Sequence, residues 1–587
     1  MKTDQSLVNI PIDAPIVVSA AWPYVNGKIH VGHLVGYFIP ADIFARYNRL
    51  KGRPVLMVSG ADCYGTPITV AADKENKTPQ EIVDEYYPQV LDLIKLLDVK
   101  YELFTKTTSN THKEVVQDLF IKLANNGYIS KKVTKQYYSE EDQKFLPDRH
   151  VEGTCPNCGA PDARADQCDN CGKTLSEGEL INPYTKLTKF PVILKDTEHY
   201  FLDFDKLQLQ LEGYTENKNF WREWVLAETK GWLKKGIEGR SITRDLDWGI
   251  SIPQNKISEN LRLENAENKK FYVWFDAVIG YLSASVEWSK LHINKDGGFD
   301  QIWLNWEHYW KNENARHYYF MGKDNLFFHT LWLPGILEGA DKSLQKPYMV
   351  SVCQWLNLDS QKFSKSKGVV LYPDYVIANY GLDALRYYLT SIMPETHDAD
   401  WRWEDFLASN NNELVANLGN FIYRVLSFYK AHPELELSMH KIEIVESTVK
   451  EEIVAAYYEV GQLLEECKFS EALKRIMEIS SFGNKYFNDN EPWKTIKTNE
   501  LMTVEIMFNC ITLIDNLRIL TNPILPSAMD RLTKMLGYTD TVTTEVGKNQ
   551  WEFREWNKNQ KMEEFLTPLF TKFDENEVLE KEGILKK

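Results

Sequence analysis

The sequence predicts an α/β protein with a Rossmann-like parallel sheet, which is interrupted by an irregular insertion and followed by an α-helical bundle. Three observations carry this prediction. A buried strand over 16–18, a helix over 31–50 and a second strand over 55–59 make a βαβ unit. Four of the eight cysteines lie between residues 155 and 171. Beyond residue 404 the apolar residues recur at helical spacing.

The composition is that of an ordinary globular protein. The 587 residues are too many for one core, and 43% are hydrophobic while 26% are charged. A net charge of −16 weakens the case for a nucleic-acid partner only modestly, because a local basic face can still bind RNA. The start lacks a signal peptide, and no apolar run reaches about 18 residues. We therefore expect a cytoplasmic protein with no membrane contact.

Further elements are expected on both sides of the insertion. Apolar periodicity predicts helices over 79–97 and 111–126, and strands over 271–275, 317–321 and 348–352. Ligands of open parallel sheets bind beyond the carboxyl ends of the strands, so polar residues that follow these strands are site candidates. The expected division is 1–130 and 236–355 for the two halves of the sheet domain, 131–235 for the insertion, 356–403 for a loop region, 404–540 for the helical domain and 541–587 for a loosely packed extension.

The loop after the first strand ends in His30-Val31-Gly32-His33, on the first turn of the expected helix. A helix N-terminus offers unpaired N–H groups and a partial positive charge, and Gly32 lets a bulky anion approach the backbone. The arrangement suits phosphate, although two ordinary helix-cap histidines explain the pattern equally well. Pro40 should kink the helix or mark its offset, because it lacks a backbone donor.

A second motif lies far downstream, in Lys362-Phe363-Ser364-Lys365-Ser366. The histidine motif and this lysine–serine loop, in this order, resemble the two signatures of class I aminoacyl-tRNA synthetases, whose second signature has Met where this chain has Phe363. The residues in between narrow the resemblance to the methionyl-tRNA synthetase family, over about 14–530. The resemblance implies a catalytic sheet domain, a stem-contact region within 356–403 and an anticodon-binding helical domain.

The reaction that the resemblance implies is the ATP-dependent ligation of L-methionine to tRNA(Met) through methionyl-adenylate. No side chain has to attack the substrate, so the protein supplies positioning and charge stabilisation. Mg²⁺ would accompany ATP, held by phosphate and water. Serine and glycine suit the lysine–serine loop for opening and closing. The implied catalytic residues are His30, His33, Lys362 and Lys365, and the implied ATP-binding residues are Tyr24, Gly32, His33, Ser364, Lys365 and Ser366.

Binding methionine requires an apolar slot, aromatic surfaces for the thioether and a carboxylate opposite the ammonium group. Aromatic and acidic residues at the expected strand ends can supply these groups, although aromatic residues in strands are often simply core. The resemblance implies that Asp62 pairs with the ammonium group. The implied methionine-binding set is Ala21, Trp22, Tyr24, Asp62, Trp274, Ala277, Tyr281 and His329.

Three residues differ from those usual in the family, which has Leu, His and Pro where this chain has Trp22, Tyr64 and Val278. The Trp22 ring matters most because it can reshape the pocket. A divergent paralogue with altered inhibitor sensitivity, or one that binds RNA without charging it, is therefore an alternative function. A damaged signature would mark the latter, and here the signature residues are intact. A nucleotidyl-transfer enzyme with a small acceptor would lack the helical domain.

The cysteine cluster has the spacing C-x2-C, nine residues, C-x2-C, with a glycine after each pair. A two-residue spacer lets both thiolates of a pair reach one ion, and four thiolates close a tetrahedral zinc shell without an open position. Free cysteines or a disulfide pair are the alternatives. The pattern favours one structural Zn²⁺, bound by Cys155, Cys158, Cys168 and Cys171.

The helical domain carries residues suited to reading unpaired bases, which stack on aromatic rings and bond to polar groups. The resemblance implies that Asn420, Arg424 and Trp493 read the anticodon. The Asn-x-x-x-Arg spacing is common on helices, whereas a tryptophan after a proline between two helices is easily exposed. No oligonucleotide-binding barrel follows the bundle, so we expect a monomer.

Overall fold

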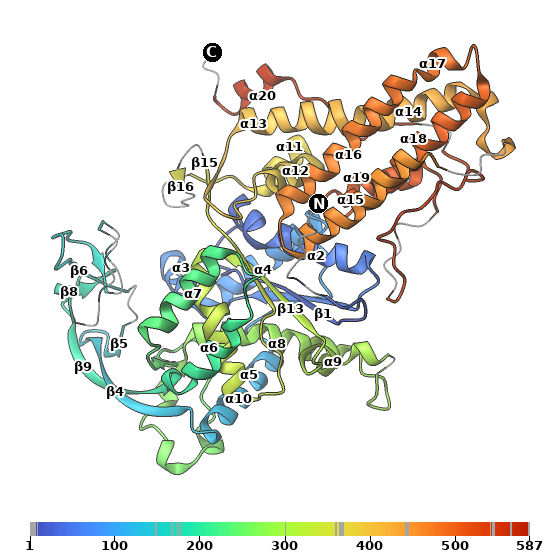
Figure 1. The fold of residues 1–587 in the computed structure, drawn as a ribbon. Helices are drawn as coiled ribbons and strands as arrows, with labels where there is room; N and C mark the ends of the chain where they lie inside the picture. The colour runs from blue at the N-terminus through green and yellow to red at the C-terminus, as the bar shows by residue number, and fades with distance from the viewer. Residues whose placement is uncertain are drawn as a thin grey trace.

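The computed structural model describes residues 8, 10–146, 150–165, 178–299, 301–358, 361–362, 369–440, 445–539, 546–563 and 566–584, with positions 168, 170, 171, 173, 175 and 542 between them. Its centre is a parallel sheet with the order β14-β13-β1-β2-β3 (Figure 1). The strands are β1 (Ile16–Ala20), β2 (Val55–Ala61), β3 (Leu103–Lys106), β13 (Arg316–Gly322) and β14 (Met349–Cys353).

The position of β1 explains where the site forms. The chain adds β2 and β3 on one side of β1, and after the insertion it adds β13 and β14 on the other. Such a reversal of strand order opens a crevice at the carboxyl ends of the central strands. All residues of β1 and β2 are buried, as expected of strands covered by helices on both faces. The predicted strands 317–321 and 348–352 are confirmed.

Helices cover both faces of the sheet. The predicted helices 79–97 and 111–126 are confirmed, and each begins at a side-chain cap, Thr78 in a capping box with Glu81 and Ser109 bonded to the His112 amide. The covering helices are α1 (Val31–His33), the π-helix η1 (Leu34–Phe38), α2 (Ile39–Leu50), α3 (Thr66–Glu75), α4 (Pro79–Leu96), α5 (Asn110–Asn125), α8 (Val273–Leu291), α9 (Trp306–Trp310), the π-helix η9 (Phe328–Trp332) and α10 (Leu333–Ala340).

The predicted strand over 271–275 is wrong. Strand β12 (Lys269–Phe271) ends where it was expected to begin, and α8 starts at Val273. Nearly every side of α8 is buried, so its apolar run lacks the polar face that marks a surface helix. Trp274, Ala277 and Tyr281 therefore lie on a helix, where the spacing i, i+3, i+7 places them on one face.

The insertion is a long, curved antiparallel ribbon that carries a small sheet at its far end (Figure 1). The elements are β4 (Ile129–Ser139), β5 (Lys144–Phe145), β6 (Val151–Thr154), β7 (Ala163–Arg164), β8 (Ile181–Thr185), β9 (Ile193–Leu202), α6 (Gln208–Glu216), α7 (Glu223–Lys235), β10 (Arg240–Ser241) and β11 (Thr243–Asp245). Two helices follow the ribbon, after which strand β10 pairs with β9 of the ribbon, and the central sheet resumes only at β13.

A small mixed sheet follows β14 and leads to the lysine–serine loop. It consists of β15 (Leu356–Leu358), β16 (Gln361–Lys362) and β17 (Ala399–Trp401), with α11 (Pro373–Tyr380) and α12 (Leu382–Ser391) between the last two. Lys362 is described only as backbone of β16, while Ser364, Lys365 and Ser366 lie outside the described residues.

The predicted helical domain is confirmed (Figure 1). Its longest helices are amphipathic or buried all round, so they form a core of their own beside the sheet domain. They are α13 (Trp403–Ala408), the π-helix η11 (Ser409–Gly419), α14 (Asn420–Ala431), α15 (Ser447–Glu465), α16 (Phe469–Asn490), α17 (Pro492–Thr495), α18 (Glu500–Thr521) and α19 (Pro526–Met535).

The C-terminal segment is not the loosely packed extension that its charge indicated. Trp551 is 4% exposed, and its indole N–H donates to the Tyr457 carbonyl at 2.9 Å while its ring meets Tyr47 of α2 edge-on. The segment ends in α20 (Glu575–Lys581), which lies beside α13. Apolar residues scattered among the charges make these contacts, and they join the two domains.

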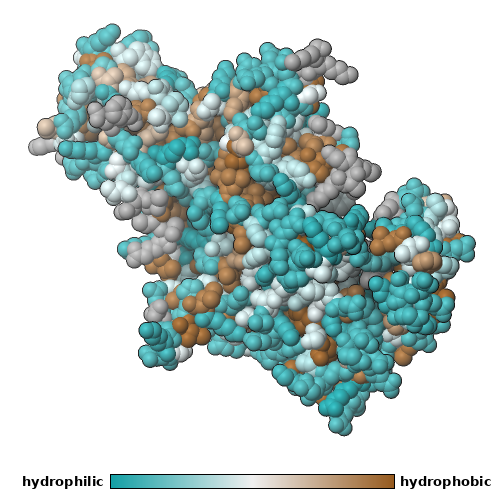
Figure 2. Space-filling model, turned by 180° about the vertical axis from the view of Figure 1, so that it is seen from behind, coloured by the Kyte–Doolittle hydropathy of each residue, from teal (hydrophilic) through white to brown (hydrophobic). Residues whose placement is uncertain are grey.

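The described helices include none that combines the length and apolarity needed to cross a membrane. Seen from behind, the surface is mostly hydrophilic, with apolar residues in small scattered groups (Figure 2).

Candidate active site

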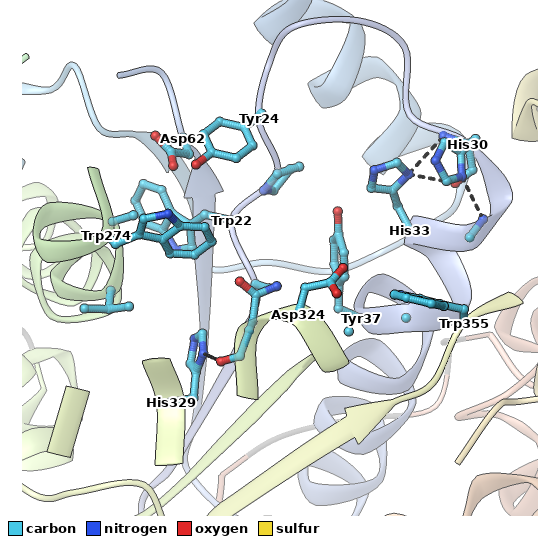
Figure 3. A pocket seen from close by; sticks show the side chains of 18 of the residues that line it. Trp22, Tyr24, His30, His33, Tyr37, Asp62, Trp274, Asp324, His329 and Trp355 are labelled. Carbon is cyan, nitrogen blue, oxygen red and sulfur yellow. Dashed lines mark hydrogen bonds between the residues drawn. The ribbon is translucent and has the colours of Figure 1, made fainter. Parts of the chain in front are cut away.

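A cavity of about 550 Å³ opens beyond the carboxyl ends of β1, β2, β13 and β14 (Figure 3). It is the crevice that the strand order requires. All eight residues predicted to bind methionine line this cavity. So do His30, Gly32 and His33, which are predicted to bind the phosphates of ATP. The cavity thus gathers Ala21, Trp22, Tyr24, His30, Gly32, His33, Asp62, Trp274, Ala277, Tyr281 and His329.

The two histidines cap the first turn of the helix. The Nδ1 atom of His30 accepts the Gly32 amide at 3.2 Å, and the Nδ1 atom of His33 accepts the His30 amide at 3.3 Å. The bond from the Gly32 amide places the proton of a neutral His30 ring on Nε2, whereas the Nδ1 atom of His33 also lies 3.3 Å from the His30 carbonyl oxygen. The imidazole ring centroids are 3.9 Å apart. The His30 ring therefore has the polarity to donate to an anion at the N-terminus of the helix, and the His33 ring lies against it.

Pro40 accounts for the irregularity of this helix. It lies in the first turn of α2, directly after the π-helix Leu34–Phe38. A proline has no N–H for the preceding turn, and the wider π turn accommodates this loss. Pro40 does not mark the offset of the helix; it lies near the start of the regular helix α2, which continues from the π turn.

Asp62 is a buried carboxyl group at the end of β2, 3% exposed, beside Tyr24 (Figure 3). Burial and the neighbouring carboxyl of Asp276 raise the pKa of Asp62 well above its usual value. Hydrogen bonds from the Tyr64 amide, at 3.2 Å, and from the Tyr24 side chain oppose that rise. A cationic group bound here would replace the lost hydration and stabilise the charged form.

Tyr281 and His329 form a hydrogen-bonded pair in the slot. Burial lowers the pKa of His329 to about 4, so the imidazole is neutral. Its Nδ1 donates to the Asn325 carbonyl at 2.9 Å, which leaves Nε2 to accept the Tyr281 hydroxyl at 2.7 Å. The pair presents polarizable, uncharged surface to a bound side chain, which suits a thioether better than a charged group.

Trp22 is wedged between the sheet and α8. A Cβ atom at Gly60 would lie 2.5 Å from its ring, and one at Gly280 would lie 2.7 Å from it. The ring meets Tyr281 edge-on at 6.3 Å between centroids. Two glycines thus make room for the larger side chain, and the ring forms part of the pocket wall.

The cysteine cluster fits a structural metal ion. The four Sγ atoms lie within 4.8 Å of one another, with Cys155 to Cys171 at 3.9 Å and Cys158 to Cys168 at 3.6 Å. A tetrahedral zinc ion with Zn–S bonds of about 2.3 Å holds its sulfurs about 3.8 Å apart. All eight cysteines are free thiols, so the disulfide alternative is excluded in this structure.

The three anticodon candidates meet at one end of the bundle. Asn420 donates to Asn484 at 3.4 Å and Arg424 donates to Asn488 at 2.9 Å, both on α16. Trp493 is 37% exposed, and its ring lies 5.7 Å from that of Phe487, also on α16. Polar groups and an exposed ring on neighbouring helices form a surface suited to unpaired bases.

Comparison with known families decides the assignment. A family model described as "tRNA synthetases class I (M)" matches residues 16–426, well over half of the chain. A second, described as "Anticodon binding domain of methionyl tRNA ligase", matches residues 440–581. The chain belongs to the methionyl-tRNA synthetase family.

Curated members of the methionyl-tRNA synthetase family are similar along most of the chain. The methionine--tRNA ligase of Roseiflexus sp. (strain RS-1) is 41% identical over 538 residues, which cover 90% of this chain and 88% of the relative. That of Thermococcus kodakarensis is 37% identical over 574 residues, covering 96% and 74%. A solved structure described as Mycobacterium tuberculosis methionyl-tRNA synthetase in complex with methionyl-adenylate matches with a TM-score of 0.73 and 20% identity, over 95% of this chain and 99% of that one. The predicted family and fold are confirmed.

Several residues of this synthetase pocket escaped the sequence analysis. Asp324 and Asn325 follow β13, and Gln354, Trp355 and Leu356 follow β14, so their places after predicted strands could have revealed them. Phe328 stacks on Trp274 with ring centroids 4.1 Å apart. No sequence signal identifies that partner, because the stack depends on the packing of α8 against η9.

Proposed function

We propose that the protein activates L-methionine with ATP, forming methionyl-adenylate and pyrophosphate, and then transfers the methionyl group to tRNA(Met). One observation carries the proposal. The candidate residues for methionine and the histidine pair for phosphate come from distant parts of the chain and line one cavity. Family membership, shown by two models and by relatives over most of the chain, supports the same reaction.

The amino acid would bind with its ammonium group at Asp62 and Tyr24 and its side chain between Trp274, Tyr281 and His329. This orientation directs the carboxylate towards the histidine pair across the cavity (Figure 3). The carboxylate oxygen itself attacks the α-phosphate, the bond to pyrophosphate breaks, and no enzyme nucleophile takes part. The contribution of the protein is to hold the two reactants in line.

Charge that grows on the phosphates would be stabilised by His30 and His33, by the N-terminus of the helix, and by Lys362 and Lys365. Fixed donors aimed at developing charge are the usual source of catalysis in phosphoryl transfer. Ser364 and Ser366 would bind ATP from the same loop. Mg²⁺ supplies further charge neutralisation, held by phosphate oxygens and water rather than by a protein cage.

In the second half of the reaction a ribose hydroxyl at the 3′ end of the tRNA would attack the methionyl carbonyl, and AMP would leave. Asn420, Arg424 and Trp493 would bind the anticodon at the far end of the bundle. We assign one structural Zn²⁺ to Cys155, Cys158, Cys168 and Cys171. We also propose a monomer in the cytoplasm, which size-exclusion chromatography and cell fractionation test.

Pyrophosphate exchange into ATP, measured with each amino acid in turn, tests the first half-reaction. Methionine should drive the fastest exchange, and exchange driven best by another amino acid, or by none, would reject the proposal. Replacement of Lys365 or His33 by alanine should lower the exchange rate by about two to three orders of magnitude. Binding of methionine alone should change little, because neither residue belongs to the amino-acid slot.

A further inference from the structure

Two acidic side chains lie close together beside the proposed amino-acid slot. Asp62 lines the cavity, whereas Asp276 of α8 lies behind the cavity wall, and both are buried. Among the described residues, no lysine or arginine forms an ion pair with either of them. Charging both carboxyl groups here is costly, because each charge is desolvated and each repels the other. The surroundings therefore favour retention of at least one proton by the pair while the slot is empty.

His112 of α5 faces the second of these carboxyl groups. Its ring is fully buried, and its Nε2 atom lies 3.7 Å from Asp276 Oδ2, slightly further than a hydrogen bond. The Ser283 hydroxyl donates to the Gly280 carbonyl at 2.9 Å, so its oxygen accepts from His112 Nδ1 at 2.7 Å. The proton of the neutral ring therefore lies on Nδ1, and Nε2 can only accept. A proton on Asp276 satisfies this acceptor, whereas an ionised Asp276 does not.

The charges around the three side chains agree with this assignment. Burial lowers the pKa of His112 to about 3, so the ring is neutral at neutral pH. The Glu287 carboxylate opposes this shift, but it is already bonded to Thr105 and Ser109 at 3.0 and 2.7 Å. Burial raises the pKa of Asp276 well above its usual value. Three further groups face the carboxyls, and burial raises the pKa of each, so they are uncharged: Cys63, Tyr64 and Tyr281.

We propose that Asp62, Asp276 and His112 act as one proton-holding cluster, which gives up a proton in exchange for the ammonium group of the bound amino acid. His112 is a positioning residue in this cluster. By accepting from the acid form of Asp276, it keeps the proton there and leaves Asp62 as the carboxyl group that ionises. The proton of Asp62 passes to solvent, and only its O–H bond breaks. The inference rests on the proposed function, which identifies the amino acid as methionine.

Titration calorimetry with L-methionine in the absence of ATP tests the cluster, because it measures the dissociation constant at each pH separately from catalysis. In the unmodified protein, log Kd should rise by about one for each pH unit below the pKa of Asp62, the slope expected for one exchanged proton. His112→Phe removes the acceptor, so Asp276 should ionise more easily and oppose a charge on Asp62. The rise in Kd should then begin about one pH unit higher.

Asp276→Asn should move the rise in Kd in the opposite direction, to lower pH. The double variant should follow Asp276→Asn, because His112 acts only through Asp276. His112→Gln keeps an oxygen that can accept from the Asp276 acid, so it should reverse most of the shift seen in His112→Phe. The matched control is His317→Phe, because His317 is another fully buried imidazole, bonded to the Tyr309 carbonyl at 2.9 Å and placed at the amino end of β13. It should leave the pH of the rise unchanged.

The inference is overturned if His112→Phe leaves the rise in place or moves it to lower pH, or if the double variant differs from Asp276→Asn. Should His112→Phe fail to fold, Ser283→Ala must move the rise to higher pH, because the freed ring can adopt the tautomer that donates to an ionised Asp276. An unchanged profile in Ser283→Ala then overturns the inference. Methionine binding with the expected shifts but without pyrophosphate exchange would support the cluster and reject the proposed function, whereas exchange with unshifted profiles would do the reverse.

Discussion

At the scale of single residues, the Trp22 ring shapes the wall of the proposed amino-acid slot, and two neighbouring glycines determine where the ring can lie. The ring fits only because Gly60 and Gly280 lack side chains at its two faces. The sequence shows a large ring at this position but does not show which residues give it space, because β2 and α8 are far apart along the chain. Packing across elements supplies that information.

Replacing Trp22 by leucine should enlarge the slot and relax its selectivity. Ethionine is one methylene longer than methionine, and its kcat/KM in pyrophosphate exchange relative to that of methionine should rise about tenfold. Gly280→Ala is the opposing control, because its Cβ would push the ring further into the slot and lower kcat/KM for both amino acids. An unchanged ethionine-to-methionine ratio in Trp22→Leu would show that the ring does not limit the slot.

The raised pKa of Asp62 predicts how methionine binding depends on pH. Because the pKa is raised, the carboxyl is neutral up to a higher pH than usual, and the neutral form attracts an ammonium group weakly. The KM for methionine should therefore rise as pH falls through this pKa. Asp62→Asn should raise KM about 10- to 100-fold at pH 8 and abolish the pH dependence.

Asp276→Asn provides the control for this profile. The Asp276 carboxyl raises the pKa of Asp62, so its replacement should shift the rise in KM to lower pH. If the dependence of KM on pH is the same in Asp276→Asn as in the unmodified protein, Asp276 does not raise the pKa of Asp62.

At the scale of elements, three π-helices adjoin predicted functional residues. The helix Leu34–Phe38 follows His33, Phe328–Trp332 contains His329, and Ser409–Gly419 directly precedes Asn420. A π turn adds a residue to the helix and rotates the side chains beyond it, and such turns occur frequently at functional sites. A proline is the second residue of the regular helix that follows each of the first two, Pro40 in α2 and Pro334 in α10, whereas α14 after the third contains no proline.

The sequence predicted that the four thiols of the cysteine cluster come together, because a two-residue spacer lets both thiols of a pair reach one ion. Cys158→Ser should lower the zinc content from about one ion per chain to well below one, since a structural site needs all four thiolates. Metal analysis of the purified protein measures this. Cys510→Ser, at a buried position in α18, should keep the zinc. Full zinc in Cys158→Ser would remove that thiol from the site.

The sequence predicted the sheet, the bundle and the site-bearing loops, and it failed where burial hides periodicity. The helix Val273–Leu291 is apolar on nearly all sides, so its first residues were interpreted as a strand. Its functional spacing, 274, 277 and 281, still follows a helical repeat. The three residues selected by motif resemblance line the cavity even though the predicted element was wrong, and their role in binding methionine stays a prediction.

At the scale of the whole molecule, the proposed amino-acid pocket lies in the sheet domain and the proposed anticodon surface lies at one end of the helical bundle. Trp493→Ala should lower kcat/KM for tRNA charging about 10- to 100-fold, because stacking of one base on an aromatic ring contributes about 1–3 kcal/mol. Pyrophosphate exchange should be unchanged. Tyr458→Ala removes another ring of the bundle that is 60% exposed, and it should affect neither assay. Equal losses in both variants would contradict a specific role for Trp493.

The C-terminal segment also acts at this scale, since Trp551 lies between α2 of the sheet domain and Tyr457 of the bundle. During synthesis on a ribosome, Tyr47 emerges early and Trp551 emerges near the end. The contacts of Trp551 between the sheet domain and the helical bundle therefore cannot form until most of the polypeptide has been synthesised. Nascent chains should consequently be cleaved by proteases at this domain interface until translation is nearly complete, whereas the full-length protein should resist cleavage there.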